Sequence, residues 1–184
     1  MSLLDRPAAS SPPGALSPEL REDLCRQWYE EHGRAIYSYL RFQLGSADEA
    51  DDLTADVFLR AVRAADRFDP ARGTAQSWLF RIARNALRDH GRRERRRRTV
   101  SLTGLRDLRT DAPSPEERVL WAEEVGRLLA ALAELPDGDR ELVSLRYGSG
   151  LSTTEVAEVL GVREAAVRTR LWRALGRLRK VLVP

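Results

Sequence analysis

The chain has 184 residues, of which 42% are hydrophobic and 32% are charged, and its formal net charge is +3. This length suits one medium domain or two small ones. Cys25 is the only cysteine, which excludes an internal disulfide and a zinc site with several thiolates, so we expect no metal and no cofactor. No apolar run approaches the roughly 20 residues of a membrane helix. The N-terminus lacks the charged segment followed by an apolar segment that is typical of a signal peptide. We therefore expect a reduced, cytoplasmic protein without membrane insertion.

The charges are distributed unevenly along the chain. Residues 19–69 hold 12 acids and 7 bases, whereas residues 81–98 hold 9 arginines and only two acids. A second basic segment, residues 163–180, holds 7 bases and one acid. One acidic and two basic segments indicate three separate interaction surfaces.

The N-terminal part of the chain reads as a disordered segment followed by helices. Residues 1–18 are rich in proline, serine and alanine, a composition that buries little apolar surface. Apolar residues then recur at helical spacing, and Gly45 is a plausible helix stop. The expected helices span about residues 20–44, 49–66 and 74–98, with a Pro- and Gly-containing loop at 68–73.

Residues 99–115 lose this periodicity and end in two prolines, which predicts a flexible linker between domains. The expected helices beyond it span about residues 116–135, 140–147, 153–160 and 164–180. No segment shows the alternation of a strand. The prediction is an all-α fold with two small helical domains, residues 19–98 and 116–184, joined by that linker.

The end of the chain matches a helix-turn-helix. Ser152 and Glu155 have the spacing of a capping box, and Gly161 suits the tight turn. Val162 and Val167 are expected to anchor the next helix, whose apolar arc also includes Leu171, Ala174, Leu175 and Leu178. Its other side carries guanidinium, hydroxyl and indole groups that suit a DNA groove, from Arg168, Thr169, Trp172 and Arg173. An amphipathic helix with a merely solvated basic face, or a partly buried Trp172, is the alternative.

The helix over 78–95 has a packing side and a basic side. Leu79, Ile82, Ala83 and Ala86 share the packing side, and the opposite side holds Arg81, Arg84, Asn85, Arg88, Arg92 and Arg95. Phosphates explain the arginines. The amide, the neighbouring Trp78 and Phe80 and the adjacent loop suit unpaired bases, which predicts contact with single-stranded DNA. In the alternative interpretation the two aromatic residues belong to the core and the arginines only aid solubility.

Asp52 and Asp56 lie one turn apart, outside the apolar arc of the second helix. Their mutual repulsion is mildly destabilising, which is tolerable if a basic partner docks there. The alternative is a solvated helix face, with acids favoured near the helix N-terminus.

Three motifs occur in order: "DDLTADVFLRAVRAADRFDP", "WLFRIARNALRDH" and "LPDGDRELVSLRYGSGLSTTEVAEVLGVREAAVRTRLWRA". Over about residues 20–180 the chain resembles the extracytoplasmic-function (ECF) sigma factors of bacterial RNA polymerase. The resemblance implies a non-enzymatic protein that binds core RNA polymerase and promoter DNA, both duplex and melted. It also implies an anti-sigma protein as a further partner.

The resemblance also implies roles for individual residues. Asp52, Leu53 and Asp56 would dock on the polymerase clamp, although Ala55 stands where the family often has glutamine. The minus-10 element would be contacted by Arg72, Trp78, Arg81, Arg84, Asn85, Arg88 and Arg92. The minus-35 element would be contacted by Arg168, Thr169, Trp172 and Arg173.

Two other functions compete with this interpretation. A stand-alone helix-turn-helix regulator explains the C-terminal motif but leaves the second basic segment and the acidic face without a role. A metal-dependent nuclease would need carboxylates such as Asp51, Asp52 or Asp56 to converge. Adjacent Asp51 and Asp52 diverge on a helix, and no histidine or glutamate joins them at ligand spacing.

Overall fold

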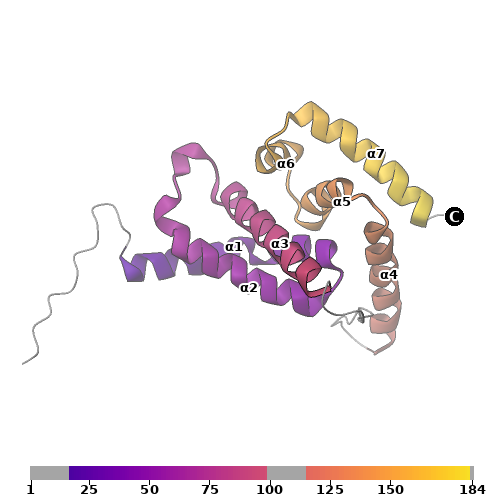
Figure 1. Ribbon diagram of the computed structural model, residues 1–184, viewed down its shortest axis with the longest axis horizontal. Coiled ribbons are helices and arrows are strands. Elements are labelled where there is room, and N and C mark those ends of the chain that lie inside the picture. The colour runs from indigo at the N-terminus through magenta and orange to yellow at the C-terminus, as the bar shows by residue number, and fades with distance from the viewer. Residues whose placement is uncertain (1–16, 99–114, 183–184) are drawn as a thin grey trace, which may run out of the picture.

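The computed structural model describes residues 17–98 and 115–182, and every regular element within these ranges is helical (Figure 1). The N-terminal half comprises α1 (Pro18–Leu44), α2 (Ala47–Ala64), the 3-10 turns η1 (Ala65–Arg67) and η2 (Pro70–Arg72), and α3 (Ala75–Arg98). The C-terminal half comprises α4 (Pro115–Ala133), α5 (Asp137–Val143), the π-helical turn η3 (Ser144–Gly148), α6 (Thr153–Leu160) and α7 (Glu164–Leu182). The all-α prediction is confirmed. The predicted disordered segment and linker lie outside the described residues, apart from positions 17, 18 and 115.

Local capping explains how α1 and α2 form a helical hairpin. The Ser17 hydroxyl accepts a hydrogen bond from the Leu20 N–H at 3.2 Å, and Pro18 occupies the first turn, where its missing N–H costs nothing. Gly45 ends α1 with φ 73°, a left-handed conformation that glycine adopts without a Cβ clash. Ser46 then caps α2 by accepting from the Glu49 N–H at 3.3 Å. The chain therefore reverses within two residues, and α2 packs along α1.

The core of the N-terminal half lies between α1, α2 and α3. Its fully buried side chains include Ile36, Tyr39, Leu40, Val57, Leu79 and Phe80. At one end, Trp28, Phe68 and Trp78 form an aromatic cluster with ring centroids 5.1–5.5 Å apart. This cluster fixes the loop between η1 and α3 against the helices.

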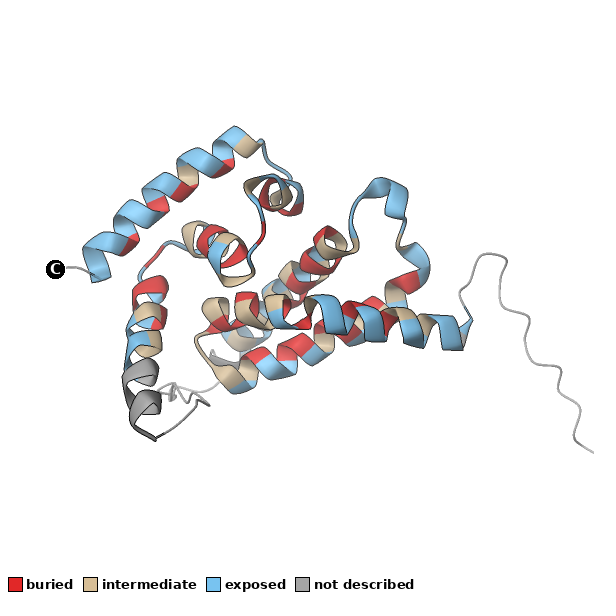
Figure 2. Cartoon of the chain, turned by 180° about the vertical axis from the view of Figure 1, so that it is seen from behind, coloured by how far each residue is buried: buried red, intermediate tan, exposed pale blue. Residues whose placement is uncertain are grey.

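The helix-turn-helix of α6 and α7 is confirmed in its local detail. The Glu155 N–H donates to the Ser152 hydroxyl at 3.2 Å, and the Ser152 N–H donates to the Glu155 carboxylate at 2.7 Å, which completes the capping box. Gly161 turns the chain with φ 69°. Val167, Leu171, Ala174 and Leu178 are buried on the inner side of α7, and its outer side is exposed (Figure 2).

Three expectations for this half were wrong. Val162 is 38% exposed, because it sits at the turn itself and only its N–H, bonded to the Ala157 carbonyl, contributes to the motif. Leu175 is 37% exposed, because it lies at the margin of the apolar stripe. The helix expected from Arg140 begins at Asp137, since the Pro136 carbonyl already accepts from the Asp139 and Arg140 N–H groups.

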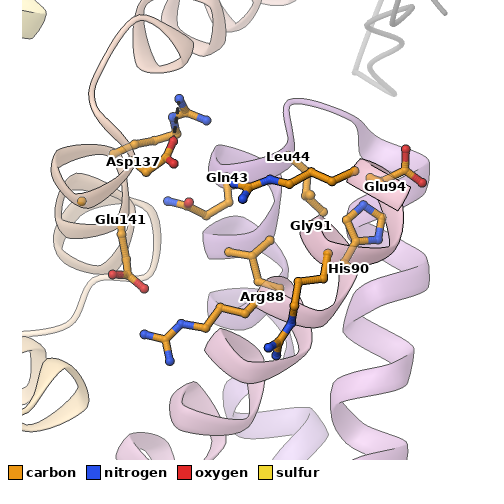
Figure 3. Close-up of a pocket in the computed structure, with 13 residues that line it drawn as sticks. Gln43, Leu44, Arg88, His90, Gly91, Glu94, Asp137 and Glu141 are labelled. Carbon is orange, nitrogen blue, oxygen red and sulfur yellow. Dashed lines mark ion pairs between the residues drawn. The ribbon is translucent and has the colours of Figure 1, made fainter. Parts of the chain in front are cut away.

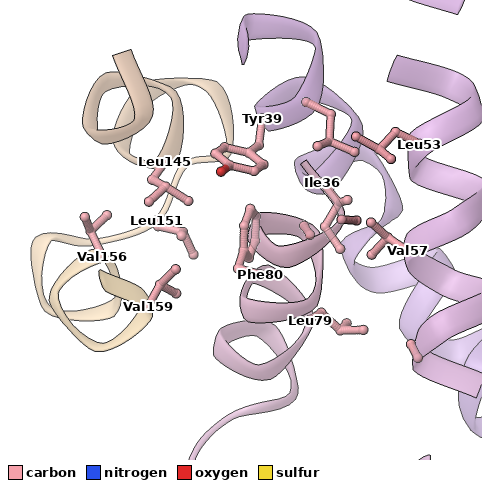
Figure 4. Close-up of a cluster of buried hydrophobic side chains, with 14 of the residues drawn as sticks. Ile36, Tyr39, Leu53, Val57, Leu79, Phe80, Leu145, Leu151, Val156 and Val159 are labelled. Atoms are coloured by element: carbon pink, nitrogen blue, oxygen red, sulfur yellow. The ribbon is translucent and has the colours of Figure 1, made fainter. Parts of the chain in front are cut away.

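The two halves share one hydrophobic core. Tyr39 of α1 and Phe80 of α3 face Leu145, Leu151, Val156 and Val159 of the C-terminal half (Figure 4). A second cluster, built from α4, α5 and α7, stabilises the C-terminal half itself. None of the helices in the described ranges is long and apolar enough to cross a membrane.

Candidate nucleic-acid interface

We use "α3 basic face" for Arg81, Arg84, Asn85, Arg88, Arg92 and Arg95. All of these side chains except Arg84 are exposed, whereas Leu79, Ala83 and Ala86 on the other side of the helix are buried. The predicted two-sided character of α3 is therefore present in the structure. Five exposed polar groups at helical spacing make a strip that suits a polyanion.

Arg84 is the exception within the α3 basic face. Its Nε donates to Glu141 at 2.7 Å, its Nη2 to the same carboxylate at 3.2 Å, and its Nη1 to the Val159 carbonyl at 2.9 Å. Only 14% of its side-chain surface is exposed. In this structure all three guanidinium nitrogens of Arg84 thus donate to the C-terminal half of the chain.

A pocket of about 350 Å³ lies where the loop after η1 meets the start of α3. Its lining residues are Arg67, Phe68, Asp69, Arg72, Gly73, Thr74, Ser77, Trp78 and Arg81. The volume falls in the range of small-ligand pockets, about 300–1,000 Å³. An aromatic wall with arginines at the rim has the chemistry to stack a base and hold its phosphate.

Hydrogen bonds hold the wall of this pocket in place. Asp69 accepts from the Ala71 N–H at 3.0 Å and shapes η2. Thr74 caps α3 by accepting from the Ser77 N–H at 3.1 Å. Trp78 is half-buried because one part of its ring packs on Trp28 and Phe68 while another part lines the pocket. The two interpretations of Trp78, core residue and pocket residue, are therefore compatible.

The further end of the α3 basic face borders a cleft of about 660 Å³ between α3 and α5 (Figure 3). Arg88, Arg92 and Arg95 line it from α3, and Asp137 and Glu141 line it from α5. Arg92 also donates to Asp89 at 2.8 Å. Hydrogen bonds from Arg60 and Arg92 lower the pKa of Asp89, so this carboxylate stays charged beside the basic face.

The acidic surface lies on α2, and we call it the α2 acidic stripe: Asp52, Asp56, Leu59 and Arg63, which recur at helical spacing. Asp52 is exposed, whereas Asp56 accepts from Arg60 at 2.9 Å and is partly covered. Leu53 is only 6% exposed and supports the stripe from within the core. Leu59 is 55% exposed and was missed by sequence reasoning, although its position seven residues after Asp52 was a usable signal.

On α7, all four residues predicted for DNA contact are exposed. Trp172 is 78% exposed, so the alternative of a partly buried Trp172 is wrong. Arg168 pairs with Glu164, which also accepts from the hydroxyls of Thr153 and Thr154. Arg173 makes no ion pair with any residue in the described ranges. The outer face of α7 thus presents an indole and an unpaired guanidinium side by side.

The two halves of the chain match two protein families. Residues 28–97 match Sigma-70 region 2, and residues 126–178 match Sigma-70 region 4. The chain is 34% identical to the ECF RNA polymerase sigma factor BldN of Streptomyces coelicolor, over 96% of this chain and 69% of that protein. It is 36% identical to the RNA polymerase sigma factor CnrH of Cupriavidus metallidurans, over 85% of each. This chain belongs to the ECF sigma factors.

Solved structures agree with the family. The sigma factor RpoE, in complex with the anti-sigma factor NepR from Bartonella quintana, superposes with a TM-score of 0.68 over 88% of this chain and 97% of that one, at 23% identity. CnrH, in complex with the cytosolic domain of CnrY, superposes with a TM-score of 0.60 over 90% of this chain and 89% of that one, at 28% identity. The present ECF sigma factor is an alternative sigma factor that directs transcription initiation.

The match to region 2 disfavours the stand-alone regulator, because it accounts for the N-terminal half that such a regulator leaves without a role. For the nuclease alternative, the described parts of the chain hold no group of three or more His, Cys, Asp or Glu residues that could bind a metal ion.

Proposed function

We propose that this sigma factor reads the minus-10 element with the α3 basic face and the adjoining pocket. The observation that carries the proposal is that Arg81 belongs to both: it lines the pocket and begins the exposed strip that continues through Asn85 and Arg88. The arginines would hold the phosphates of the melted strand. The pocket, with Arg72 at its rim and Trp78 in its wall, would receive an unpaired base, and Asn85 would discriminate among bases by hydrogen bonding.

We propose that α7 reads the minus-35 element as duplex. Helix-turn-helix proteins insert their second helix in the major groove. Arg168, Thr169, Trp172 and Arg173 are the exposed groups on its outer face. Arg173 would grip a base edge or a phosphate, and Trp172 would pack against a thymine methyl or the sugar backbone.

We propose that the α2 acidic stripe docks on core RNA polymerase. The stripe combines the charge of Asp52 and Asp56 with the exposed Leu59, and an apolar anchor surrounded by charges is typical of a protein interface. The polymerase supplies the chemistry, and we propose that the sigma factor itself has no catalytic activity and works in the cytoplasm. An anti-sigma protein is a further proposed partner, because the similar sigma factor RpoE was solved in complex with the anti-sigma factor NepR.

Run-off transcription tests this function directly. Purified core RNA polymerase is supplied with genomic promoter fragments, with and without the protein. We expect transcripts that depend on the protein, and the sequences upstream of their start sites give the two promoter elements. Absence of transcripts, together with tight duplex binding by the protein alone, would favour the stand-alone regulator instead.

A further inference from the structure

Arg168, one of the α7 residues assigned to the minus-35 element, has an acidic partner on its own helix. Glu164 lies one turn before it and pairs with its guanidinium. The Arg168 side chain is still 61% exposed, and that of Glu164 is 39% exposed. Arg173 on the same outer face is exposed and makes no ion pair within the described residues. Two arginines assigned to the same DNA element therefore differ in their electrostatic surroundings.

Two hydroxyls of the preceding helix hold the Glu164 carboxylate. The Thr153 hydroxyl donates to Oε1 at 3.2 Å, and the Thr154 hydroxyl donates to Oε2 at 3.3 Å. Both threonines belong to the first turn of α6, which packs beside the start of α7 (Figure 1). Arg168 donates to Oε1 through Nη1. Because the donors come from two helices, the carboxylate is held in place, and it in turn orients the guanidinium.

The position of this carboxylate matters because of how a helix-turn-helix binds DNA. The first helix crosses the phosphate backbone, and the first residues of the second helix reach the base edges. Glu164 is the first residue of α7 and contacts the first turn of α6, so its charge lies where backbone and groove meet. There it repels phosphates. It also offsets the charge of Arg168, which would otherwise attract a phosphate in DNA of any sequence.

The pairing leaves Arg168 able to read a base. A guanidinium has N–H donors on Nε, Nη1 and Nη2, and only Nη1 donates to Glu164. The other two nitrogens can donate to the O6 and N7 acceptors of a guanine edge. A side chain that is already oriented also loses less conformational entropy on binding than a free one. The carboxylate therefore weakens phosphate contact by Arg168 more than it weakens base contact.

We propose that Glu164 is a positioning residue for minus-35 recognition, which orients Arg168 toward a guanine edge and keeps it from binding phosphates of any sequence. The inference rests on the proposed minus-35 role of α7. Specificity is a difference between two affinities, and a repulsive group can increase it by weakening the wrong complex. Glu164 has this effect here, because it lowers affinity for unrelated DNA while the base contact is retained.

Glu164→Gln tests this role, because glutamine keeps the shape of the side chain and removes its charge. Binding of the full-length variant is measured on two duplexes. One carries the minus-35 element found by run-off transcription, and the other carries the same bases in scrambled order. Each Kd is measured over a range of salt concentrations. The matched control is Glu134→Gln, which removes the same charge from an exposed position in the same half of the chain.

We expect Glu164→Gln to bind the scrambled duplex several-fold more tightly than wild type. The dependence of log Kd on log salt should steepen by about 0.9, the value for one further phosphate contact. Binding of the matched duplex should change less, so the ratio of the two affinities should fall several-fold. Glu134→Gln should leave the slope and the ratio close to those of wild type. An unchanged slope and ratio in Glu164→Gln would overturn the proposal.

The wild type alone shows whether the underlying minus-35 assignment holds. A wild type that binds the matched and the scrambled duplex equally would count against the minus-35 surface of α7, and the inference would fail with it. A wild type that prefers the matched duplex, together with a Glu164→Gln variant that keeps this preference, would overturn the role of Glu164 alone.

A double-mutant cycle with Arg168→Ala separates positioning from general repulsion. If Glu164 acts through Arg168, Glu164→Gln should alter neither the salt slope nor the affinity ratio in the Arg168→Ala background. Equal changes in both backgrounds would overturn the positioning role, because the carboxylate would then act on DNA directly. Thermal unfolding of each variant checks that α7 remains folded.

A further variant tests how the carboxylate is held. Thr153→Val combined with Thr154→Val removes both hydroxyls and keeps the branched shape of the side chains. We expect a shift in salt slope and affinity ratio in the same direction as in Glu164→Gln, but smaller, because the charge remains and only its position is released. An unchanged slope and ratio would refute the part of the proposal in which α6 holds Glu164.

Discussion

Arg60 of α2 donates a 2.8 Å hydrogen bond to Asp89 of α3, and so joins the helix of the α2 acidic stripe to the helix of the basic face. Asp89 also accepts from Arg92 at 2.8 Å. These two partners lower the pKa of Asp89, while Arg60 at the same time binds Asp56. One carboxylate thus holds two arginines and couples two proposed binding surfaces.

This coupling predicts how stability depends on pH. Because the folded pKa of Asp89 lies below its ordinary value of 3.8, the stabilisation is fully present above that value and is lost as the pH falls through the folded pKa. We expect Asp89→Asn to lower the melting temperature near neutral pH, and the difference from wild type to shrink as the pH falls below 3.8. A pH-independent difference would show that Asp89 acts by packing alone. Asp51→Asn, the same change at an exposed position on α2, serves as the control.

Asn85→Ala tests base discrimination in the minus-10 element. Asn85 is exposed, so its removal leaves the core intact. We expect preference among minus-10 sequences to fall by about 1 kcal/mol, the net worth of one hydrogen bond, with polymerase affinity unchanged. Competition between promoters that differ at single minus-10 positions measures this preference. Arg93→Ala, an exposed change outside the α3 basic face, provides the comparison, and an unaltered promoter preference in Asn85→Ala would remove the residue from the reading surface.

Asp52→Arg combined with Asp56→Arg tests the α2 acidic stripe. We expect the double variant to lose binding to core RNA polymerase, because two repulsive charges would face the basic partner. Its circular dichroism should remain helical, since neither carboxylate is in the core. The control variant changes two exposed acids at the start of α1, Glu19 and Asp23, to arginine, and it should still bind core RNA polymerase. Retained binding by the stripe variant would refute the docking surface.

Helical periodicity, capping and composition carried most of the fold prediction. The capping box at Ser152 and the turn at Gly161 act within a few residues, so their geometry is encoded locally. The contact of Arg84 with Glu141 spans 57 positions and depends on how two halves pack, which no local pattern reveals. For this reason sequence reasoning placed Arg84 with its exposed neighbours. Leu59 was missed for a different reason. It lies on the acidic face of α2, which was recognised only by its charged residues, and a leucine carries no charge.

Arg173→Ala separates base reading from phosphate contact on α7. If the guanidinium donates to a base edge, the free energy of binding to the preferred minus-35 sequence should weaken by about 1–3 kcal/mol, and binding to unrelated sequences should change little. Binding of duplexes with matched and scrambled minus-35 elements measures the sequence-specific and the sequence-independent parts of the affinity. An equal loss on the two duplexes would assign Arg173 to the phosphate backbone. Arg179→Ala, in the last turn of the same helix, controls for the loss of one positive charge.

Trp172 and Trp28 are the same residue type in opposite environments, with 78% and 3% of their surface exposed. Trp172→Ala should leave the thermal stability of the protein unchanged, because the indole contacts little in the free chain, and should weaken minus-35 binding by removing a large apolar contact. Trp28→Ala should instead destabilise the fold by about 3–5 kcal/mol, as expected for a large aromatic residue removed from a core. Thermal unfolding and duplex binding of the two variants distinguish these effects. A marked loss of stability in Trp172→Ala would mean that the indole packs against the protein in solution and is not free to meet DNA.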